Sequence, residues 1–393
     1  MLNRNTVFVM LTAAVVASCD AKPERVPSKD PAATVTPAVE TAVMPDADDA
    51  ADDPAIWVHP TNPAQSLVIG TNKQRGLVVY RLDGSEASKR DDGRMNNVDL
   101  RQNVKIGAFA GDLVASTNRD KKSIDVYGFD GASALLSPLL SIPTGFNDPY
   151  GLCLYRSAKS GDLYVIANNS DDGMVGQWRM TANGTALDAE QVRNFSVGSQ
   201  AEGCAVDDEN GVLFIAEEDV GLYAYWAEPA GAAENNNARI VIDSTTGTGH
   251  LTMDAEGVAV LKTPDGGGYV IVSSQGSNSY NVYDRASPHA FRGAFQIGPT
   301  AEQAGIDGVE ETDGIDATSA SLGGAFSEGL FVAQDGFNYD GIQEGPRKHQ
   351  NFKLVPWSQI RTALKLPEPA QAAPVETAVE PAAEAAPTEA KPN

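Results

Sequence analysis

The stretch Leu113-Val114-Ala115-Ser116-Thr117-Asn118-Arg119, an apolar run that ends in polar residues, is one of six similar copies in the 393-residue chain and decides the fold. The other copies are 67–73 (LVIGTNK), 164–169 (YVIANN), 213–218 (LFIAEE), 269–275 (YVIVSSQ) and 330–335 (LFVAQD). In the first five copies an alternating run follows and closes on an aromatic residue: Tyr80, Tyr127, Trp178, Tyr225 and Tyr283. Short runs of β-branched and aromatic residues with alternating polarity are typical of strands.

A second motif lies upstream of each copy. It is a polar or acidic residue, usually with a glycine after it, and then a short apolar run. The six instances begin at Asp53, Asn97, Tyr150, Glu202, Glu256 and Asp313. A period of about 50 residues with short strands is typical of a propeller with one four-stranded blade per repeat. We therefore predict an all-β fold, a six-bladed β-propeller over residues 46–365. A pair of β-sandwiches would not explain the regular register.

The two ends of the chain differ from its body. Residues 1–19 resemble a lipoprotein-type signal peptide, because Arg4 precedes an apolar stretch at 7–17 and Val16-Ala17-Ser18-Cys19 is similar to a bacterial lipobox. The protein is thus expected to be exported in a bacterium. It would be periplasmic and membrane-anchored through Cys19, or secreted if that cysteine is incidental. Residues 20–45 and the Pro/Ala/Glu-rich 366–393 are predicted to be disordered tails, because they carry too little apolar surface to fold.

Two cysteines remain in the body, Cys153 and Cys204. They could form a disulfide in an oxidising compartment. Both lie in apolar runs that resemble strands, where a free buried cysteine is the commoner outcome. The sequence leaves the pairing open and favours free thiols.

The chain carries 53 acidic and 29 basic residues, a formal net charge of −24. Such a surface repels nucleic acid and anionic lipid, so we expect no nucleic-acid partner and no membrane contact beyond the lipid anchor. It also repels phosphorylated substrates, so phosphate chemistry here would need metal ions or a local basic patch. We expect a monomer.

The repeat predicts two rings of polar residues at one mouth of the propeller channel, because equivalent positions of each blade lie around the axis. Asp53, Glu202, Glu256 and Asp313 would converge in the inner ring. The ends of the second strands would form a wider ring: Asn72, Asn118, Asn169, Glu218, Gln275 and Asp335. Clustered carboxylate and amide oxygens favour calcium over zinc or copper. Such a site could also hold a purely structural cation.

The scarce basic residues favour a catalytic site. Lys73 and Arg119 occupy the same register in successive blades, and Arg75, Lys121 and Lys122 lie beside them. Arginine and lysine bind phosphate oxygens. A basic arc beside several calcium ions suits a polyanion. The ions would neutralise phosphate and activate a bridging water that attacks it directly, without a covalent intermediate on the protein.

Motifs in every blade resemble those of the β-propeller phytases, the alkaline, calcium-dependent 3-phytase family. The resemblance covers 46–362 and rests on these segments: 52–60 (DDPAIWVHP), 71–73 (TNK), 201–203 (AEG), 215–219 (IAEED), 254–257 (DAEG), 273–276 (SSQG), 312–316 (TDGID), 332–336 (VAQDG) and 351–353 (NFK). It implies hydrolysis of phytate, myo-inositol hexakisphosphate, as its calcium complex, with release of inorganic phosphate and lower inositol phosphates.

The resemblance also assigns roles. Asp254, Glu256, Gln275 and Asp313 resemble calcium ligands together with Glu202, with Asp53 close by and Asp307 as a further ligand; Asp335 of the wider ring joins this predicted metal set. Lys73 and Arg119 resemble phosphate contacts, and Arg75 is a further candidate. Tyr150 resembles a phosphate contact and Glu218 an acidic residue near the attacking water, so Glu202, Glu218 and Tyr150 are the predicted catalytic residues.

The chain departs from the family pattern on its basic side. Gln74 stands where the family often has a second lysine, and 168–170 (NNS) where another phosphate-binding lysine is expected. These changes affect the expected affinity for phytate more than the expected type of reaction. Two alternatives stay open: a non-catalytic calcium-binding propeller module, and a propeller lactonase or phosphodiesterase.

Overall fold

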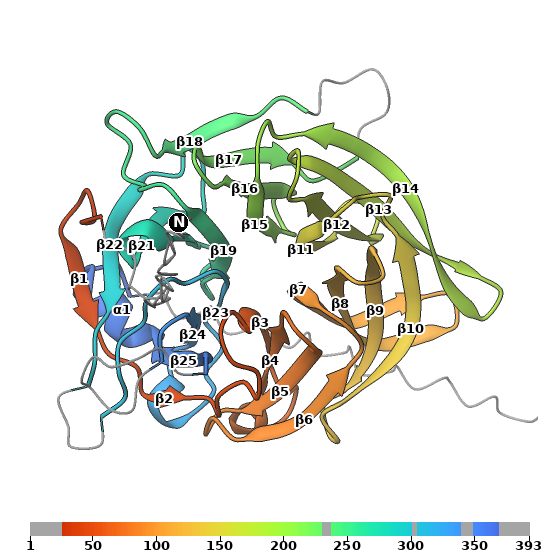
Figure 1. The fold of residues 1–393 in the computed structure, drawn as a ribbon, viewed down its shortest axis with the longest axis horizontal. Helices are drawn as coiled ribbons and strands as arrows, with labels where there is room; N and C mark the ends of the chain where they lie inside the picture. Colours follow the sequence, from red (N-terminus) through yellow and green to blue (C-terminus); the bar gives the residue numbers. More distant parts are fainter. Residues whose placement is uncertain (1–25, 230–236, 301–304, 339–348, 369–393) are drawn as a thin grey trace, which may run out of the picture.

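The computed structural model describes residues 26–229, 237–300, 305–338 and 349–368. Six β-sheets surround a central axis like the blades of a propeller (Figure 1). The prediction of an all-β, six-bladed propeller is confirmed. In the described residues the one α-helix is α1 (Trp357–Ala363), and no helix is long and apolar enough to cross a membrane.

Each blade is an antiparallel sheet whose first strand lies nearest the axis and whose later strands follow outward. The inner strands are β3 (Ala51–Trp57), β7 (Met95–Ile106), β11 (Pro149–Arg156), β15 (Ala201–Asp207), β19 (Ala255–Lys262) and β23 (Ile315–Thr318). The second strands are β4 (Leu67–Asn72), β8 (Phe109–Asn118), β12 (Leu163–Asn169), β16 (Val212–Glu217), β20 (Gly268–Ser274) and β24 (Leu330–Asp335). The predicted starts of five inner strands thus fall within strands, and the sixth lies two residues before β23.

The outer parts of the blades come from the third and fourth strands. The third strands are β5 (Gly76–Arg81), β9 (Ser123–Asp130), β13 (Met174–Asn183), β17 (Gly221–Trp226), β21 (Ser279–Asp284) and β25 (Asn351–Pro356). The fourth strands of the first five blades are β6 (Glu86–Asp91), β10 (Leu135–Pro143), β14 (Ala186–Ser196), β18 (Ile240–Ser244) and β22 (Phe291–Ile297).

Apolar side chains fill the seams between blades, because each sheet presents alternate residues to both of its neighbours. The buried residues form one apolar cluster at each seam. Ile69 of the first blade, for example, belongs to the same cluster as Val114 and Tyr127 of the second. Each large apolar side chain buried in this way contributes about 1.5–3 kcal/mol. The seams therefore fix the blades around the axis.

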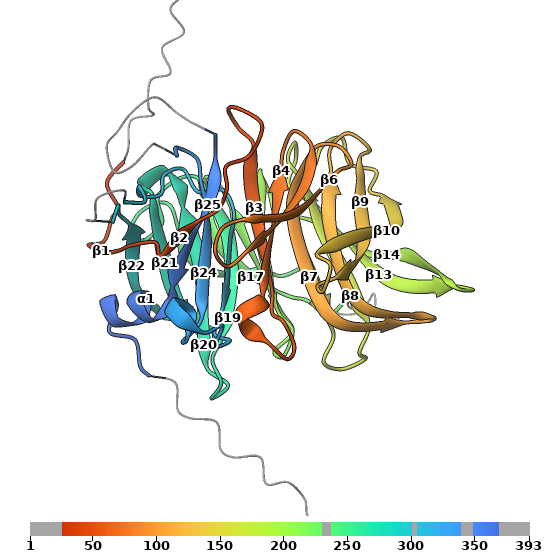
Figure 2. The same ribbon diagram turned by 90° about the horizontal axis from the view of Figure 1, so that it is seen from below.

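The N-terminal segment completes two sheets. β1 (Ala32–Val35) pairs in parallel with β22, and β2 (Val39–Glu40) pairs with β25 as the outermost strand of the sixth blade. Figure 2 shows both strands running along the side of the propeller. The predicted disorder of 20–45 is therefore wrong for these strands, because sheet edges supply the backbone partners that this polar segment could not provide by itself. The predicted signal peptide 1–19, with Cys19, and most of the predicted C-terminal tail lie outside the described residues.

Candidate active site

The predicted inner ring lies at the mouth of the propeller where the inner strands begin. Tyr150, Glu202 and Glu256 directly follow the first residues of β11, β15 and β19. In the first blade the equivalent residue is Asp52, so the prediction that placed Asp53 in this register is wrong by one residue. Glycine follows Tyr150, Glu202 and Glu256 because the neighbouring blades approach closely. A Cβ on Gly151, for example, would lie 1.8 Å from the carbonyl oxygen of Glu202. The glycines of the motif thus allow the ring residues to crowd together.

Three carboxylates form the centre of the site. One oxygen from each of Glu202, Glu218 and Glu256 lies within 4.8 Å of the others. Glu202 is 1% exposed and Glu256 is 6% exposed. In the described part of the chain, Glu218 Oε1 and Glu256 Oε2 are buried and have no hydrogen-bond partner. Burial and then the negative charge of Glu202 raise the pKa of Glu218 to about 8 and raise that of Glu256 well above its usual value. The cluster is therefore short of positive charge.

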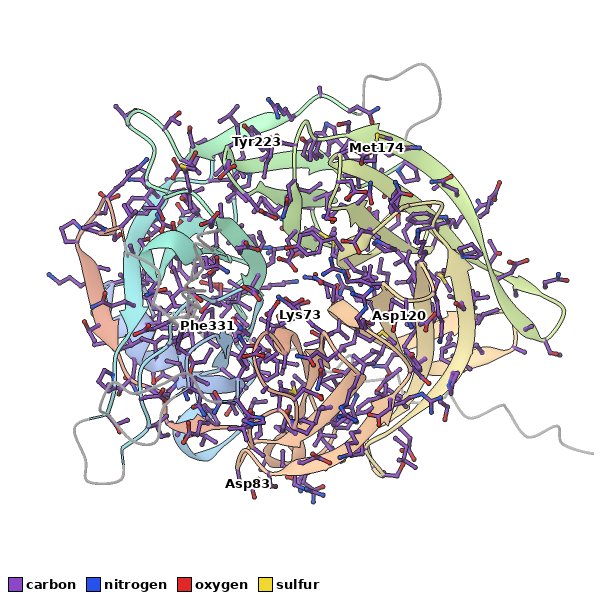
Figure 3. The ribbon with its side chains drawn as sticks, in the orientation of Figure 1. Lys73, Asp83, Asp120, Met174, Tyr223 and Phe331 are labelled. Carbon is purple, nitrogen blue, oxygen red and sulfur yellow. A yellow bond between two sulfur atoms is a disulfide. The ribbon has the colours of Figure 1, made fainter. Side chains whose placement is uncertain are left out.

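Lys73 lies beside this cluster and close to the propeller axis (Figure 3). Its Nζ is 2.6 Å from Asp313 Oδ2, 2.9 Å from Asp52 Oδ1 and 3.1 Å from Asp49 Oδ1. Burial acts to lower the pKa of Lys73, but the carboxylates of Asp313 and Asp52 outweigh it, so this pKa is raised. Gln275 Nε2 donates to Asp313 Oδ1 at 2.5 Å. The structure thus brings together the predicted residues Lys73, Gln275 and Asp313.

Arg119 reaches the same centre from the second blade. Its guanidinium donates to Asp148 Oδ1 at 2.7 Å and to Asn96 Oδ1 at 3.0 Å, and lies 5.5 Å from the centre of the Tyr150 ring. Asn96 in turn donates to Glu202. Burial, and then the charge of Glu202, raise the pKa of the Tyr150 hydroxyl far above its usual value, so it stays protonated. Arg119, Tyr150 and Glu202 therefore form one connected group.

The predicted wider ring has a different register in the structure. The residue directly after each second strand donates its backbone N–H to the segment before the inner strand of its own blade. These equivalent strand-end positions are Lys73, Arg119, Ser170, Glu218, Gln275 and Gly336. Glu218 and Gln275 are therefore equivalent to Lys73 and Arg119, and the prediction that grouped them with Asn72 and Asn118 is wrong. The ring is basic in two blades, acidic in one and uncharged in three.

Three predicted residues lie around this centre with other contacts. Asp53 is 7% exposed, and its Oδ2 accepts the backbone N–H of Val98 at 3.0 Å. Asp254 directly precedes β19 with φ of +60°, and its carbonyl accepts the N–H of Gln275. Arg75 is half-exposed and bonds Asp46 at 2.7 Å. Arg75 thus belongs to a surface ion pair next to the site.

Asp307 and Asp335 form a second group in the sixth blade. The fully buried Lys353 lies between them, with Nζ 2.6 Å from Asp307 Oδ1, 3.2 Å from Asp335 Oδ2 and 2.7 Å from Glu40 Oε2. Their role as calcium ligands remains a prediction, since an ammonium group already neutralises part of their charge.

The two cysteines are joined by a disulfide between β11 and β15. The expectation of free thiols is wrong, because the inner strands of neighbouring blades place the two side chains together. Cys153 is three residues from Tyr150 and Cys204 is two residues from Glu202. The disulfide therefore links the two strands that carry two of the predicted catalytic residues.

Sequence reasoning missed three contributors: Asp52, Asn96 and Asp148. Asp52 is completely buried against Lys73, and its pKa is raised by burial and then by Glu202. It directly precedes Asp53, and Asn96 directly precedes the inner-ring position Asn97, so the repeat could have indicated both. Asp148 carries no such signal, because its partner Arg119 is distant in sequence.

The residues present fit calcium. The donors at the site are carboxylate and amide oxygens, which are the ligands of hard cations. Buried carboxylate oxygens without partners are costly unless a cation or a proton compensates them. Glu218 and Glu256 supply such oxygens. Glu202 and Asp313 add further carboxylates, and Gln275 an amide.

Comparison with known proteins decides the family. The family model described as Phytase matches residues 3–382. The chain belongs to the phytase family. A 3-phytase of Bacillus subtilis (strain 168) is 40% identical over 337 residues, which cover 84% of this chain and 85% of that protein. The predicted resemblance is thus confirmed, and the phytase is a phosphoric monoester hydrolase. Membership of the phytase family argues against the two alternatives, a non-catalytic calcium-binding module and a propeller lactonase or phosphodiesterase.

Solved structures support the propeller fold. An α-L-arabinanase of Penicillium chrysogenum, solved with arabinobiose, aligns with a TM-score of 0.52 and 14% identity over 82% of this chain and 99% of that one. At this identity the likeness shows only the fold of the phytase.

Proposed function

We propose that this phytase hydrolyses phytate in a calcium-dependent reaction at the mouth formed by the inner ring. The observation that carries the proposal is the group of buried carboxylates around Glu202, Glu218 and Glu256, with unpartnered oxygens, directly beside the cations Lys73 and Arg119. A carboxylate cluster alone would repel phytate, and the two cations alone could not offset six phosphates. The combination suits a substrate that arrives with calcium.

Each residue then has a definite part. The proposed calcium ligands are Asp53, Glu202, Asp254, Glu256, Gln275 and Asp313. When bound, calcium supplies the positive charge that offsets the phosphate and makes water a better nucleophile. Lys73 and Arg119 bind the phosphate oxygens, and the protonated Tyr150 hydroxyl donates to them. Glu218 Oε1 accepts a proton from the attacking water.

The basic side of the site is limited to two blades. Ser170 holds the strand-end position where the third blade would need a cation, and its hydroxyl donates to Asp148 Oδ2 at 2.8 Å. Gln74 donates to the carbonyls of Ala47 and Asp49. We infer that a neighbouring phosphate of phytate is held mainly through calcium, so that substrate affinity depends strongly on calcium concentration.

Phosphate release from phytate tests the proposal. The assay compares calcium with EDTA for the wild type, Glu202→Gln and the control Asp208→Asn, whose carboxylate lies at the other end of the channel. We expect release only in calcium and a loss of about 10³-fold in Glu202→Gln, because a group that organises charge at the reacting centre is removed. Full release in EDTA would refute the calcium requirement, and an unaffected Glu202→Gln would refute the site. Export and a lipid anchor at Cys19 are part of the proposal, tested by metabolic labelling with palmitate.

A further inference from the structure

In five of the six blades, one buried polar side chain lies beneath the active site. It stands two residues before the strand-end position, at a register that we call the tie position. The tie positions are Thr71, Thr117, Asn168, Ser273 and Gln334, with Ala216 in the fourth blade. Each polar member is at most 1% exposed. Buried hydroxyl and amide groups need partners, and the partners of this set lie in the inner ring.

Thr117 and Asn168 each join two blades. Thr117 Oγ1 accepts the N–H of Asn97 in its own blade and donates to the carbonyl of Tyr150 in the next blade, at 3.1 and 2.5 Å. Asn168 Oδ1 accepts the N–H of Gly151 at 2.7 Å, and its Nδ2 donates to the carbonyl of Glu202 at 3.2 Å. A hydroxyl and an amide thus make the same pair of connections in successive blades.

The sixth and fifth blades continue the pattern. Gln334 Oε1 accepts the N–H of Asp313 at 2.8 Å, and its Nε2 donates to the carbonyl of Ala51 at 3.2 Å. Ser273 Oγ donates to the carbonyl of Thr312, the residue before Asp313, at 2.8 Å. Gln334 and Ser273 therefore fix the backbone at and just before Asp313, and Gln334 also fixes the backbone of the first blade at Ala51.

The two remaining seams are joined by other groups at the same level. Thr71 bonds only within its own blade, to the N–H and carbonyl of Asp53, and Asp53 Oδ2 itself accepts the N–H of the second blade. Where the fourth blade has Ala216, the carbonyl of Glu218 accepts the N–H of Ala255 at 2.9 Å. Every seam thus has a hydrogen bond directly under the ring.

We propose that Thr117 and Asn168 are positioning residues for phytate hydrolysis: by holding the backbone carbonyls of Tyr150 and Glu202, they set how these two side chains lie relative to each other. The blades do not need these bonds to stay together, because the apolar seams and the Cys153–Cys204 disulfide already join them. Both side chains donate to the backbone carbonyl of a residue whose own side chain faces the reaction, Tyr150 for Thr117 and Glu202 for Asn168. A shift of about 1 Å at a reacting centre can cost about a hundredfold in rate.

Paired substitutions at Asn168 test the proposal. Threonine and valine have the same shape, but only threonine has the hydroxyl that Thr117 uses one blade earlier. We expect Asn168→Val to lower kcat by about tenfold or more, as for residues that orient a reacting group through another, with little change in KM. Asn168→Thr should recover most of that loss. Thr117→Val should lower kcat in the same way, and Thr117→Asn should restore it.

A buried threonine away from the ring serves as the matched control. Thr41 is 3% exposed, and its hydroxyl accepts the N–H of Phe352 at the outer edge of the sixth blade. Thr41→Val should lower the melting temperature without changing kcat measured well below it. Equal kcat values for Asn168→Val and Asn168→Thr would overturn the proposal, as would a kcat loss in Thr41→Val of the same size. If Asn168→Val does not fold, the Thr117→Val and Thr117→Asn pair decides the question. If neither valine variant folds, the residues are structural and the proposal is wrong.

A second readout concerns the calcium ligand Glu202 and rests on the proposed function. The rise in melting temperature on adding calcium should need about a tenfold higher calcium concentration in Asn168→Val than in the wild type, because the ligand is less well placed. The same titration should be unchanged in Thr41→Val. A wild-type protein that shows no calcium effect would refute the proposed function, whereas the kcat comparison of the valine and threonine variants would still decide the role of the tie positions.

Discussion

The two mouths of the propeller channel use the same residue types in opposite ways. At the active-site mouth, Glu218 and Glu256 present buried carboxylate oxygens without hydrogen-bond partners among the described residues. Toward the other mouth, Asp99 accepts the N–H of Leu154 at 2.8 Å and Asp316 that of Ile56 at 2.8 Å. Carboxylates are abundant at both mouths. The active-site mouth differs in that some of its buried carboxylate oxygens, those of Glu218 and Glu256, are left without hydrogen-bond partners in the described part of the chain.

Cations differ between the mouths as well. Arg101 pairs with Asp99 and with Asp208, at 2.9 and 2.8 Å, beside a channel cavity of about 320 Å³. Arg285 is buried against Asp207 and Glu209. These pairs use their charge within the protein. At the active-site mouth, buried oxygens of Glu218 and Glu256 have no hydrogen-bond partner among the described residues, so a bound cation or a proton must compensate them.

The largest expected difference between the two mouths is in activity. Asp313 at the active-site mouth and Asp316 toward the other mouth are only three residues apart in the sequence, so substituting each of them tests this difference. Asp313→Asn should lower kcat/KM by about a hundredfold or more, because it removes a proposed ligand and one of the three carboxylates around Lys73. Asp316→Asn should retain most of the activity, since its carboxylate serves the backbone of the next blade. Phosphate release from phytate in calcium measures both. Equal losses would show that the two mouths are not functionally distinct.

The second difference concerns pH in the absence of calcium. Burial raises the pKa of Glu218 to about 8 and that of Asp316 to about 7, so the folded protein holds these protons more tightly than the unfolded chain does. This contribution to stability is complete below the pKa of the unfolded chain near 4 and is lost as the pH rises through 7 to 8. In EDTA, the melting temperature should therefore fall by about 10 °C between pH 5 and pH 8.

Calcium separates the two mouths in that experiment. Added at pH 8, it should restore the melting temperature of the wild type and of Asp316→Asn but not that of Glu202→Gln. The reason is that, in the part of the chain that the structure describes, the unpartnered oxygens of Glu218 and Glu256 lie at the active-site mouth. Differential scanning calorimetry measures the effect. A melting temperature that does not change with pH in EDTA would contradict the raised pKa values.

The smallest expected effect comes from the disulfide, which lies between the mouths on β11 and β15. Replacing both Cys153 and Cys204 by serine opens a cross-link over a sequence separation of 51 residues. This should cost about 4 kcal/mol and lower the melting temperature by about 5 °C. Activity well below that temperature should stay high, because Thr117 and Asn168 still hold Tyr150 and Glu202. A large loss of kcat in the folded variant would show that the disulfide itself positions the active site.

Much of the fold was readable from the sequence, because each blade repeats its hydrophobic pattern and its inner-strand motif. The register at the strand ends was not. In the first blade Ala51 pairs with Asn72, whereas in the fourth Ala201 pairs with Glu217, one residue earlier than the aligned runs indicate. Inner strands with β-bulges and second strands of unequal length shift the ring position by one residue. This shift can be seen only when the strands are paired.

The sequence predicted the site to the same extent: residues at repeated positions were found, and their partners from other blades were not. Lys73, Arg119, Glu202, Glu256 and Asp313 could be found because each stands at a repeated position. Their partners Asp148 and Asn96 depend on which side chains meet across blades. The environment of Asp335 was equally hidden, because Lys353 comes from a different strand of the same blade.

The pairing of β2 with β25 has a consequence for biosynthesis. Val39 pairs with Leu354 and Glu40 with Lys353, so a strand made early closes the blade made last. During synthesis or translocation the first five blades emerge before the sixth can form, and the ring stays open at both edges until nearly the whole chain is available. Premature termination before β24 would leave those edges exposed, with Asp313 and its neighbours unsupported. Closure of the ring therefore waits for β24 and β25, the strands that complete the sixth blade.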